Sequence, residues 1–244
     1  MTSLALAVLI AVGLTSASSN AALGQATGPS FVQQVSAHRA GVSSLTLTPA
    51  AAVTTGDRLI VEIGVWNAAA ATATAVTDSA GNTYTELTHF KAPDGTEQSI
   101  WTAPLTAGGG TKPTITAKVT SAADIGAAAL EYAGLSTAAG TAALDVQAHA
   151  TGTTTAAPAT VTSGPTPATT SGSELALGFY TDSGFGDTLT AGTGYTSRVN
   201  LAPTPDMELL AEDQTTTQGA TPAATTATGP NTIWLMTTIV LRHA

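Results

Sequence analysis

The stretch Leu59-Ile60-Val61-Glu62-Ile63-Gly64-Val65-Trp66 decides the fold class. Its odd-numbered residues, from Leu59 to Val65, are all apolar, and this period of two predicts a β-strand with those residues on one face. About twelve shorter alternating runs, separated by Gly, Pro, Asn and Asp, follow from Phe31 to the end of the sequence; they include Ser44–Thr48, Thr83–Thr88, Thr114–Val119, Leu175–Phe179 and Thr232–Leu241. Such spacing predicts an all-β fold, namely an antiparallel two-sheet sandwich that is jelly-roll-like.

The composition agrees with this fold and excludes several kinds of function. Of the 244 residues, 48 are Ala and 47 are Thr, and the branched side chain of Thr suits strands. Seven basic residues against 16 acidic ones give a net charge of −9, which argues against binding to nucleic acid or to an anionic membrane surface. The absence of Cys excludes disulfides, thiolate metal sites and Cys nucleophiles.

The N-terminal segment is predicted to be an export signal. Leu4–Leu14 is an uncharged apolar run that is too short to span a bilayer, and small residues suited to a signal peptidase follow it. No Lys or Arg precedes the run, so a retained hydrophobic helix that packs in an assembly stays as an alternative. We therefore expect residues 1–26 to be a secretory signal or N-terminal hydrophobic segment, with membrane contact only before cleavage, and a secreted or cell-surface location.

The remainder, residues 29–244, is predicted to form a single β-sandwich domain. Two low-complexity stretches, Thr151–Ser173 and Thr215–Pro230, are rich in Thr and Pro, a composition also typical of linkers. Because apolar strands continue on both sides, we interpret them as edge strands and long loops. The residues expected in the core are Val61, Ile63, Val65, Ile100, Leu130, Leu177, Leu235 and Ile239.

Asp182 and Asp187 form the best candidate metal site. They lie five residues apart on a loop made flexible by Gly184 and Gly186, so both carboxylates can reach one cation. Calcium is the metal that such oxygens favour, but the loop lacks the spacing of a calcium-binding hand. A plain loop is the alternative, and no other cofactor is expected.

Aromatic rings and carboxylates supply the remaining candidates. Tyr84, Tyr180 and Tyr195 lie near predicted loops and are the candidate ligand contacts, whereas the Trp residues sit in apolar strands typical of a core. Three glutamates lie in or beside strands and are the candidate acid–base pair of a hydrolase; they are Glu62, Glu131 and Glu174. The alternative is that each points outward on the solvated face of its strand or lies at a strand end.

Several pieces of the sequence occur in a familiar order. They are Gly56–Val61, Val76–Tyr84, Ile100–Ala103, Leu130–Leu135, Ser173–Gly178, Glu212–Gln214 and Trp234–Arg242. The series resembles a β-sandwich module of secreted bacterial surface proteins and some phage structural proteins, over about residues 31–242. This resemblance implies the same fold, and it brings no catalytic residues with it.

These observations favour a secreted, non-catalytic surface module that self-associates or binds a cell-surface protein or polysaccharide. The expected contact is a sheet edge or a flat face rich in Thr and Ala, because few Lys residues are present to block strand pairing. Three alternatives stay open: a carbohydrate-binding protein, a filament or phage-type structural subunit, and a secreted hydrolase that uses paired carboxylates.

Overall fold

The computed structural model describes residues 28–202 and 206–244, so the predicted leader, residues 1–26, lies outside the described part of the chain. The strands are β1 (Ser30–Leu47), β2 (Arg58–Trp66), β3 (Ala73–Asp78), β4 (Thr85–Lys91), β5 (Glu97–Pro104), β6 (Ile115–Ala133), β7 (Leu144–Thr153), β8 (Ala159–Thr162), β9 (Glu174–Asp182), β10 (Thr196–Leu201), β11 (Glu208–Thr216), β12 (Thr225–Thr228) and β13 (Ile233–Leu241). One 3₁₀ turn, η1 (Gly140–Ala143), precedes β7. No helix in these residues is long and apolar enough to cross a membrane.

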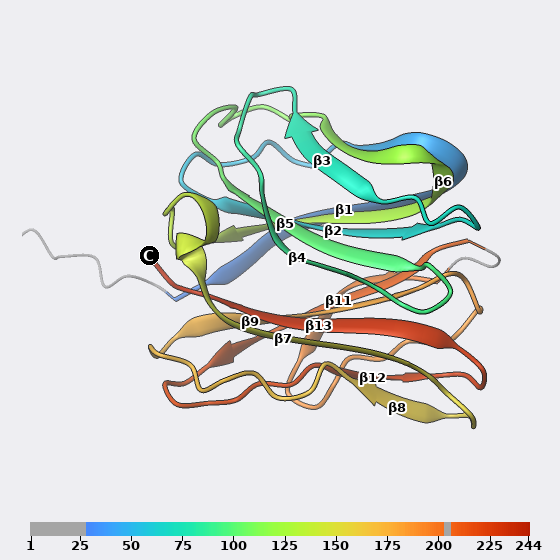
Figure 1. Ribbon diagram of the computed structural model, residues 1–244. Coiled ribbons are helices and arrows are strands. Elements are labelled where there is room, and N and C mark those ends of the chain that lie inside the picture. The colour runs from blue at the N-terminus through green and yellow to red at the C-terminus, as the bar shows by residue number, and fades with distance from the viewer. Residues whose placement is uncertain (1–27, 203–205) are drawn as a thin grey trace, which may run out of the picture.

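Two antiparallel sheets pack face to face, which confirms the predicted sandwich (Figure 1). The first has the strand order β1-β6-β2-β5-β4, and the second has the order β10-β11-β9-β13-β7. The inter-sheet core lies between them and is built from Ile60, Ile100, Leu130, Leu177, Phe179, Leu209 and Ile239, among others.

Each sheet also carries an additional layer on its outer side (Figure 1). Above the first sheet, β3 pairs with the first half of β6, which also pairs with the end of β1. This curled part closes an upper core on the odd-numbered face of β2, as predicted for Val61, Ile63 and Val65. Below the second sheet, β8 and β12 form a two-stranded layer over a lower core that includes Tyr180, Leu210 and Met236.

The four layers explain why the central strands are buried on both faces. All nine residues of β9 are buried, and β2 is buried from Arg58 to Val65. All eight core residues expected from the sequence are buried, and the exposed fraction of each is 0%. Small residues allow the close approach of the layers: a Cβ on Gly64 would lie 2.7 Å from the side chain of Thr181 in the opposite sheet.

Candidate functional site

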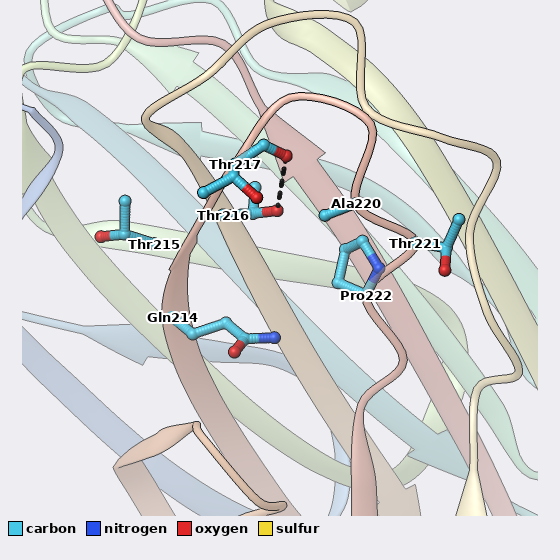
Figure 2. Close-up of a pocket in the computed structure, with 7 residues that line it drawn as sticks. All are labelled: Gln214, Thr215, Thr216, Thr217, Ala220, Thr221 and Pro222. Carbon is cyan, nitrogen blue, oxygen red and sulfur yellow. Dashed lines mark hydrogen bonds between the residues drawn. The ribbon is translucent and has the colours of Figure 1, made fainter.

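The outer layer of β8 and β12 is bordered by hollows in the surface. One of them, of about 320 Å³, lies where the chain turns back from β11 toward β12 (Figure 2). Its lining residues are Gln214, Thr215, Thr216, Thr217, Ala220, Thr221 and Pro222. Thr166 and Thr169 donate backbone hydrogen bonds to Pro222 and Ala220, so this hollow borders an irregular extension of the β8–β12 ladder.

Two further hollows, of about 200 and 210 Å³, lie along β12 itself. Both are formed between β12 and the segment that follows β9, which is attached by a hydrogen bond from Thr190 N to Thr226 Oγ1 of 3.1 Å. The linings consist of Ala157, Pro158, Asp187, Thr188, Ala227, Thr228 and Gly229 for one, and Thr160, Thr190–Thr193 and Thr225–Ala227 for the other. Asp187 is the one charged residue in the three linings, and none of them contains an aromatic ring.

The tyrosines predicted as exposed ligand contacts do not line these hollows. Tyr180 is fully buried and donates a 2.7 Å hydrogen bond to Asp182, and Tyr195 is only 9% exposed. Tyr84 is half-buried and donates to Asp78 at 3.1 Å, where it supports the turn after β3. The expectation of exposed rings is therefore wrong for Tyr180 and Tyr195, because the β8–β12 layer covers the face of the sheet on which they lie.

Asp182 and Asp187, the predicted metal ligands, do lie close together. Glu208 joins them from the neighbouring strand β11, and one carboxylate oxygen of each residue lies within 4.8 Å of the others. Glu208 was not identified as a candidate ligand from the sequence, because it lies 26 positions after Asp182 along the chain. Only the pairing of Glu208 with Asp182 between β11 and β9 places it beside the two aspartates.

The oxygens of this acidic cluster already accept hydrogen bonds. Asp182 accepts from Gly184 N at 2.7 Å, and Glu208 accepts from the backbone N–H groups of Phe185 and Asp187 at 3.1 and 3.0 Å. Asp187 accepts from the hydroxyl groups of Thr228 and Thr232. The cluster thereby fixes the loop that borders one of the hollows, and this alone gives it a structural role.

The three carboxyl groups differ in their affinity for protons. Burial raises the pKa of Glu208, and the adjacent Asp182 raises it further. Burial likewise raises the pKa of Asp182, although it accepts hydrogen bonds from Gly184 and Tyr180. Burial acts in the same direction on Asp187, but its bonds from Thr228, Gly229 and Thr232 lower its pKa overall. Asp182 and Glu208 therefore both bind protons more tightly than exposed carboxyl groups do, and a cation placed between them would compete with those protons.

The calcium hypothesis stays a prediction and now includes Glu208. If calcium binds between these carboxylates, we expect CaCl₂ to raise the unfolding temperature of the wild type at about pH 8 by several degrees, because a ligand that binds only the folded state stabilises it. Differential scanning calorimetry of the wild type and of Asp187→Asn measures this. Equal responses of the two proteins, or none, would contradict the hypothesis.

Glu62, Glu131 and Glu174, the proposed hydrolase carboxylates, have three separate sets of neighbours. Glu62 faces the inter-sheet core and accepts from Thr181, Glu131 accepts from Thr54 N at 2.8 Å, and Glu174 lies beside Asp145. No hydrogen bond joins any two of them. All three are buried, so the alternative of solvated, outward-pointing side chains is wrong, whereas Glu174 does lie at a strand end, as the first residue of β9.

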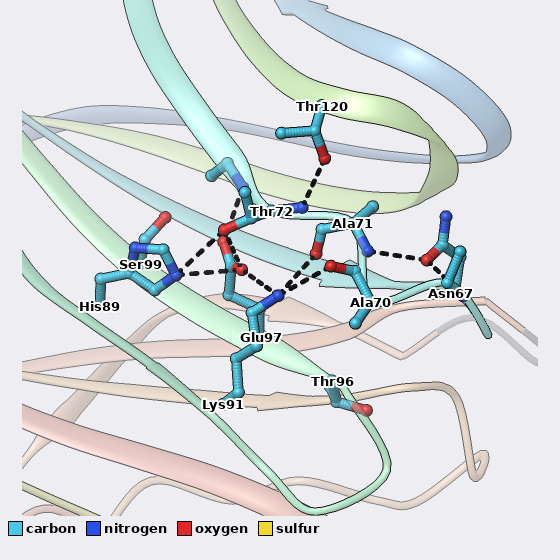
Figure 3. A network of polar contacts seen from close by, with 12 residues as sticks. Asn67, Ala70, Ala71, Thr72, His89, Lys91, Thr96, Glu97, Ser99 and Thr120 are labelled. Atoms are coloured by element: carbon cyan, nitrogen blue, oxygen red, sulfur yellow. Dashed lines mark hydrogen bonds and ion pairs between the residues drawn. The ribbon is translucent and has the colours of Figure 1, made fainter.

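A surface network around Glu97 contains the arrangement nearest to a catalytic triad (Figure 3). His89 Nε2 lies 3.2 Å from Thr72 Oγ1, and His89 Nδ1 lies 3.1 Å from Glu86 Oε1. However, the Thr72 hydroxyl donates at 2.5 Å to the buried carboxylate of Glu97, which also binds Lys91 at 3.2 Å. With its proton held by Glu97, Thr72 is not activated by His89, and the network instead ties the loop before β3 to strands β4 and β5.

Comparison with known proteins identifies no relative: no family model, curated protein or solved structure matches the chain.

Proposed function

We propose that the protein is a secreted, non-catalytic surface module that self-associates through the outer layer formed by β8 and β12. The carrying observation is that three hollows lined mainly by Thr, Ala and backbone surround this one layer. The apolar run Leu4–Leu14 and the resemblance to bacterial surface modules support export. The arrangement nearest to a catalytic triad among the described residues, around His89, leaves the Thr72 hydroxyl proton bonded to Glu97, which supports a non-catalytic role.

The strand β8 offers an edge for a second copy. It pairs with β12 and with no other strand in the described residues. Its sequence, Ala159-Thr160-Val161-Thr162, contains no charge, and Lys, the usual guard of an edge strand, is absent. Thr160 and Thr162 are exposed, so two β8 strands can approach in antiparallel register around a two-fold axis.

The charge distribution favours a second copy over other occupants. Each chain carries a net charge of −9, so most approaches of two copies are repulsive. The hollows around β8 and β12 hold only the carboxylate of Asp187, which bonds to Thr228 and Thr232 and has a lowered pKa. This nearly neutral face is where two acidic chains meet at the least electrostatic cost, and we expect weak dependence on salt.

The test is the oligomeric state of the protein with a charge placed on this edge. We expect the wild type to show a concentration-dependent dimer by light scattering, and Thr160→Lys to weaken association by tenfold or more, because it adds a guard residue to the edge. Thr77→Lys is the matched control, since Thr77 is also an exposed strand threonine but lies on β3. It should associate like the wild type.

A monomeric wild type at millimolar concentration would overturn the proposal. In that case, retention on a neutral polysaccharide that Thr160→Lys abolishes would favour the carbohydrate-binding alternative. Association that falls steeply between low and moderate salt would also contradict the proposed contact, because it would show pairing through charges.

A further inference from the structure

Four polar side chains meet at the centre of the apolar layer between the two sheets. Glu62 comes from β2 and Gln98 from β5 in the first sheet; Thr181 comes from β9 and Thr237 from β13 in the second. Each is 0% exposed. Burying polar groups in an apolar layer is costly, so their convergence requires an explanation.

The hydrogen bonds arrange these groups around the side-chain amide of Gln98. Its Nε2 donates to Thr181 Oγ1 at 3.0 Å and to Glu62 Oε1 at 3.1 Å. Thr181 in turn donates its hydroxyl proton to Glu62 Oε1 at 3.1 Å. On the other side of the amide, Thr237 donates to Gln98 Oε1 at 2.7 Å.

Glu62 has properties that a purely structural bridge does not need. Its Oε2 atom is buried without any hydrogen-bond partner, and no cation pairs with it among the described residues. Burial raises the pKa of Glu62 well above its usual value, although Thr181 and Gln98 donate to it. The carboxyl group therefore binds a proton more tightly than an exposed glutamate does, and its Oε1 touches both a hydroxyl group and an amide nitrogen.

We propose that Thr181 and Gln98 form an intramolecular ester that links the two sheets covalently. The Thr181 hydroxyl oxygen attacks Cδ of Gln98, an O–C bond forms, the Cδ–Nε2 bond breaks, and the nitrogen leaves as ammonia. The hydroxyl proton passes through Glu62 to the departing nitrogen, so Glu62 ends the reaction unchanged. No oxidant, metal or other reactant is needed.

The neighbouring groups match the roles that this reaction requires. The hydrogen bond from Nε2 already holds Thr181 Oγ1 3.0 Å from the amide nitrogen, and a rotation of the Gln98 amide would turn Cδ toward that oxygen. Glu62 Oε1 contacts both the group that loses a proton and the group that gains one, as a general acid–base must. Thr237 donates to the oxygen on which negative charge develops, and exclusion of water protects the ester from hydrolysis.

The geometry also suits a chain that cannot form disulfide bonds. The chain contains no Cys, and the ester would join residues 83 positions apart in the sequence. It would connect β5 to β9 across the sandwich. Such a link resists separation of the two sheets, which is the failure that an extracellular module under mechanical or proteolytic stress must avoid.

Mass spectrometry of the intact folded protein tests the proposal. We expect the wild type to weigh less than its sequence predicts by the mass of one ammonia. A proteolytic digest should then contain one cross-linked peptide that joins Gln98 to Thr181, and hydroxylamine, which cleaves esters, should separate it. A folded wild type with its full mass and an intact Gln98 amide would overturn the proposal, as would a link from Gln98 to Thr237.

Variants separate the chemistry from folding. Thr181→Val should have the full mass, whereas the conservative variant Thr181→Ser keeps the hydroxyl group and should still lose ammonia. Glu62→Gln should slow the mass loss by tenfold or more, because the proton carrier is removed. Loss of ammonia from Thr181→Val would contradict the assignment of Thr181 as the attacking residue. Circular dichroism is used to check that each variant is folded.

Discussion

Lowering the pH from about 8.5 to about 5 is expected to raise the unfolding temperature of this protein by about 10 °C or more. Burial, together with Asp145, raises the pKa of Glu174 to about 7. Burial also raises the pKa of Glu212 to about 7, with a smaller contribution from Asp213. Glu208 and Glu62 shift in the same direction, also chiefly through burial. The folded protein therefore binds more protons than the unfolded chain between about pH 4.5 and pH 8.

The direction follows from linkage between protonation and folding. A carboxyl group with a raised pKa in the folded state stabilises fully below its unfolded pKa, and this contribution is lost as the pH rises through the folded value. Each pKa unit corresponds to about 1.4 kcal/mol, and about 1 kcal/mol moves the unfolding temperature of a chain of this size by about 2–4 °C. Asp145 and Asp187 have lowered pKa values and act oppositely only at more acidic pH.

Calorimetry across this pH range measures the effect, and one variant isolates part of it. Glu212 is fully buried, and its Oε1 has no hydrogen-bond partner. Glu212→Gln cannot ionise, so its unfolding temperature should fall less than that of the wild type as the pH rises. An unfolding temperature that is flat or that increases toward pH 8.5 would show that these carboxyl groups are not held protonated.

The buried carboxyl groups also show which parts of the fold could be predicted from the sequence and which could not. Alternation of apolar residues correctly located the core residues and several strands, among them β2, β9 and β13, because a period of two depends only on local geometry. It predicted a two-layer sandwich with solvated outer faces, on which Glu62 and Glu174 would lie. The outer layers of β3 and of β8–β12 cover those faces instead, and they form through long-range pairing that no local pattern records. Glu62 does not lie on such an outer face, because the even-numbered face of β2 packs against the second sheet.

One local signal did indicate the additional layers. The stretch Leu59–Val65 places apolar residues on both faces, as at Ile60 beside Val61, and such continuous apolar runs are typical of strands covered on both sides. The acidic cluster shows the complementary limit. Asp182 and Asp187 are close in sequence and were found together, whereas Glu208 joins them only through the register of β11 against β9.

Arg58→Ala is expected to cause the largest loss of stability of any single substitution considered, about 3–5 kcal/mol. Arg58 is 0% exposed at the start of β2. Its guanidinium donates to the carbonyl oxygens of Ser136 and Ala138 at 2.8 and 2.6 Å and to Thr102 Oγ1 at 3.1 Å. Truncation would leave these three acceptors, of which Thr102 is buried and the two carbonyl oxygens lie in partly buried contacts, without their donors and would also open a cavity.

Comparison of substitutions at this position separates the two costs. Burial lowers the pKa of Arg58 to about 10, so the side chain stays charged at neutral pH while no carboxylate forms an ion pair with it in the described residues. Arg58→Met fills much of the volume but supplies no donor, and we expect it to lose less stability than Arg58→Ala.

Arg39→Ala is the matched control, because Arg39 is exposed on β1 and its truncation should cost no more than about 0.5 kcal/mol. Denaturant unfolding gives all three values. Equal stability of Arg58→Met and the wild type would show that the side chain acts by filling space. A small loss of stability in Arg58→Ala would show that the loop after β6 does not depend on these hydrogen bonds.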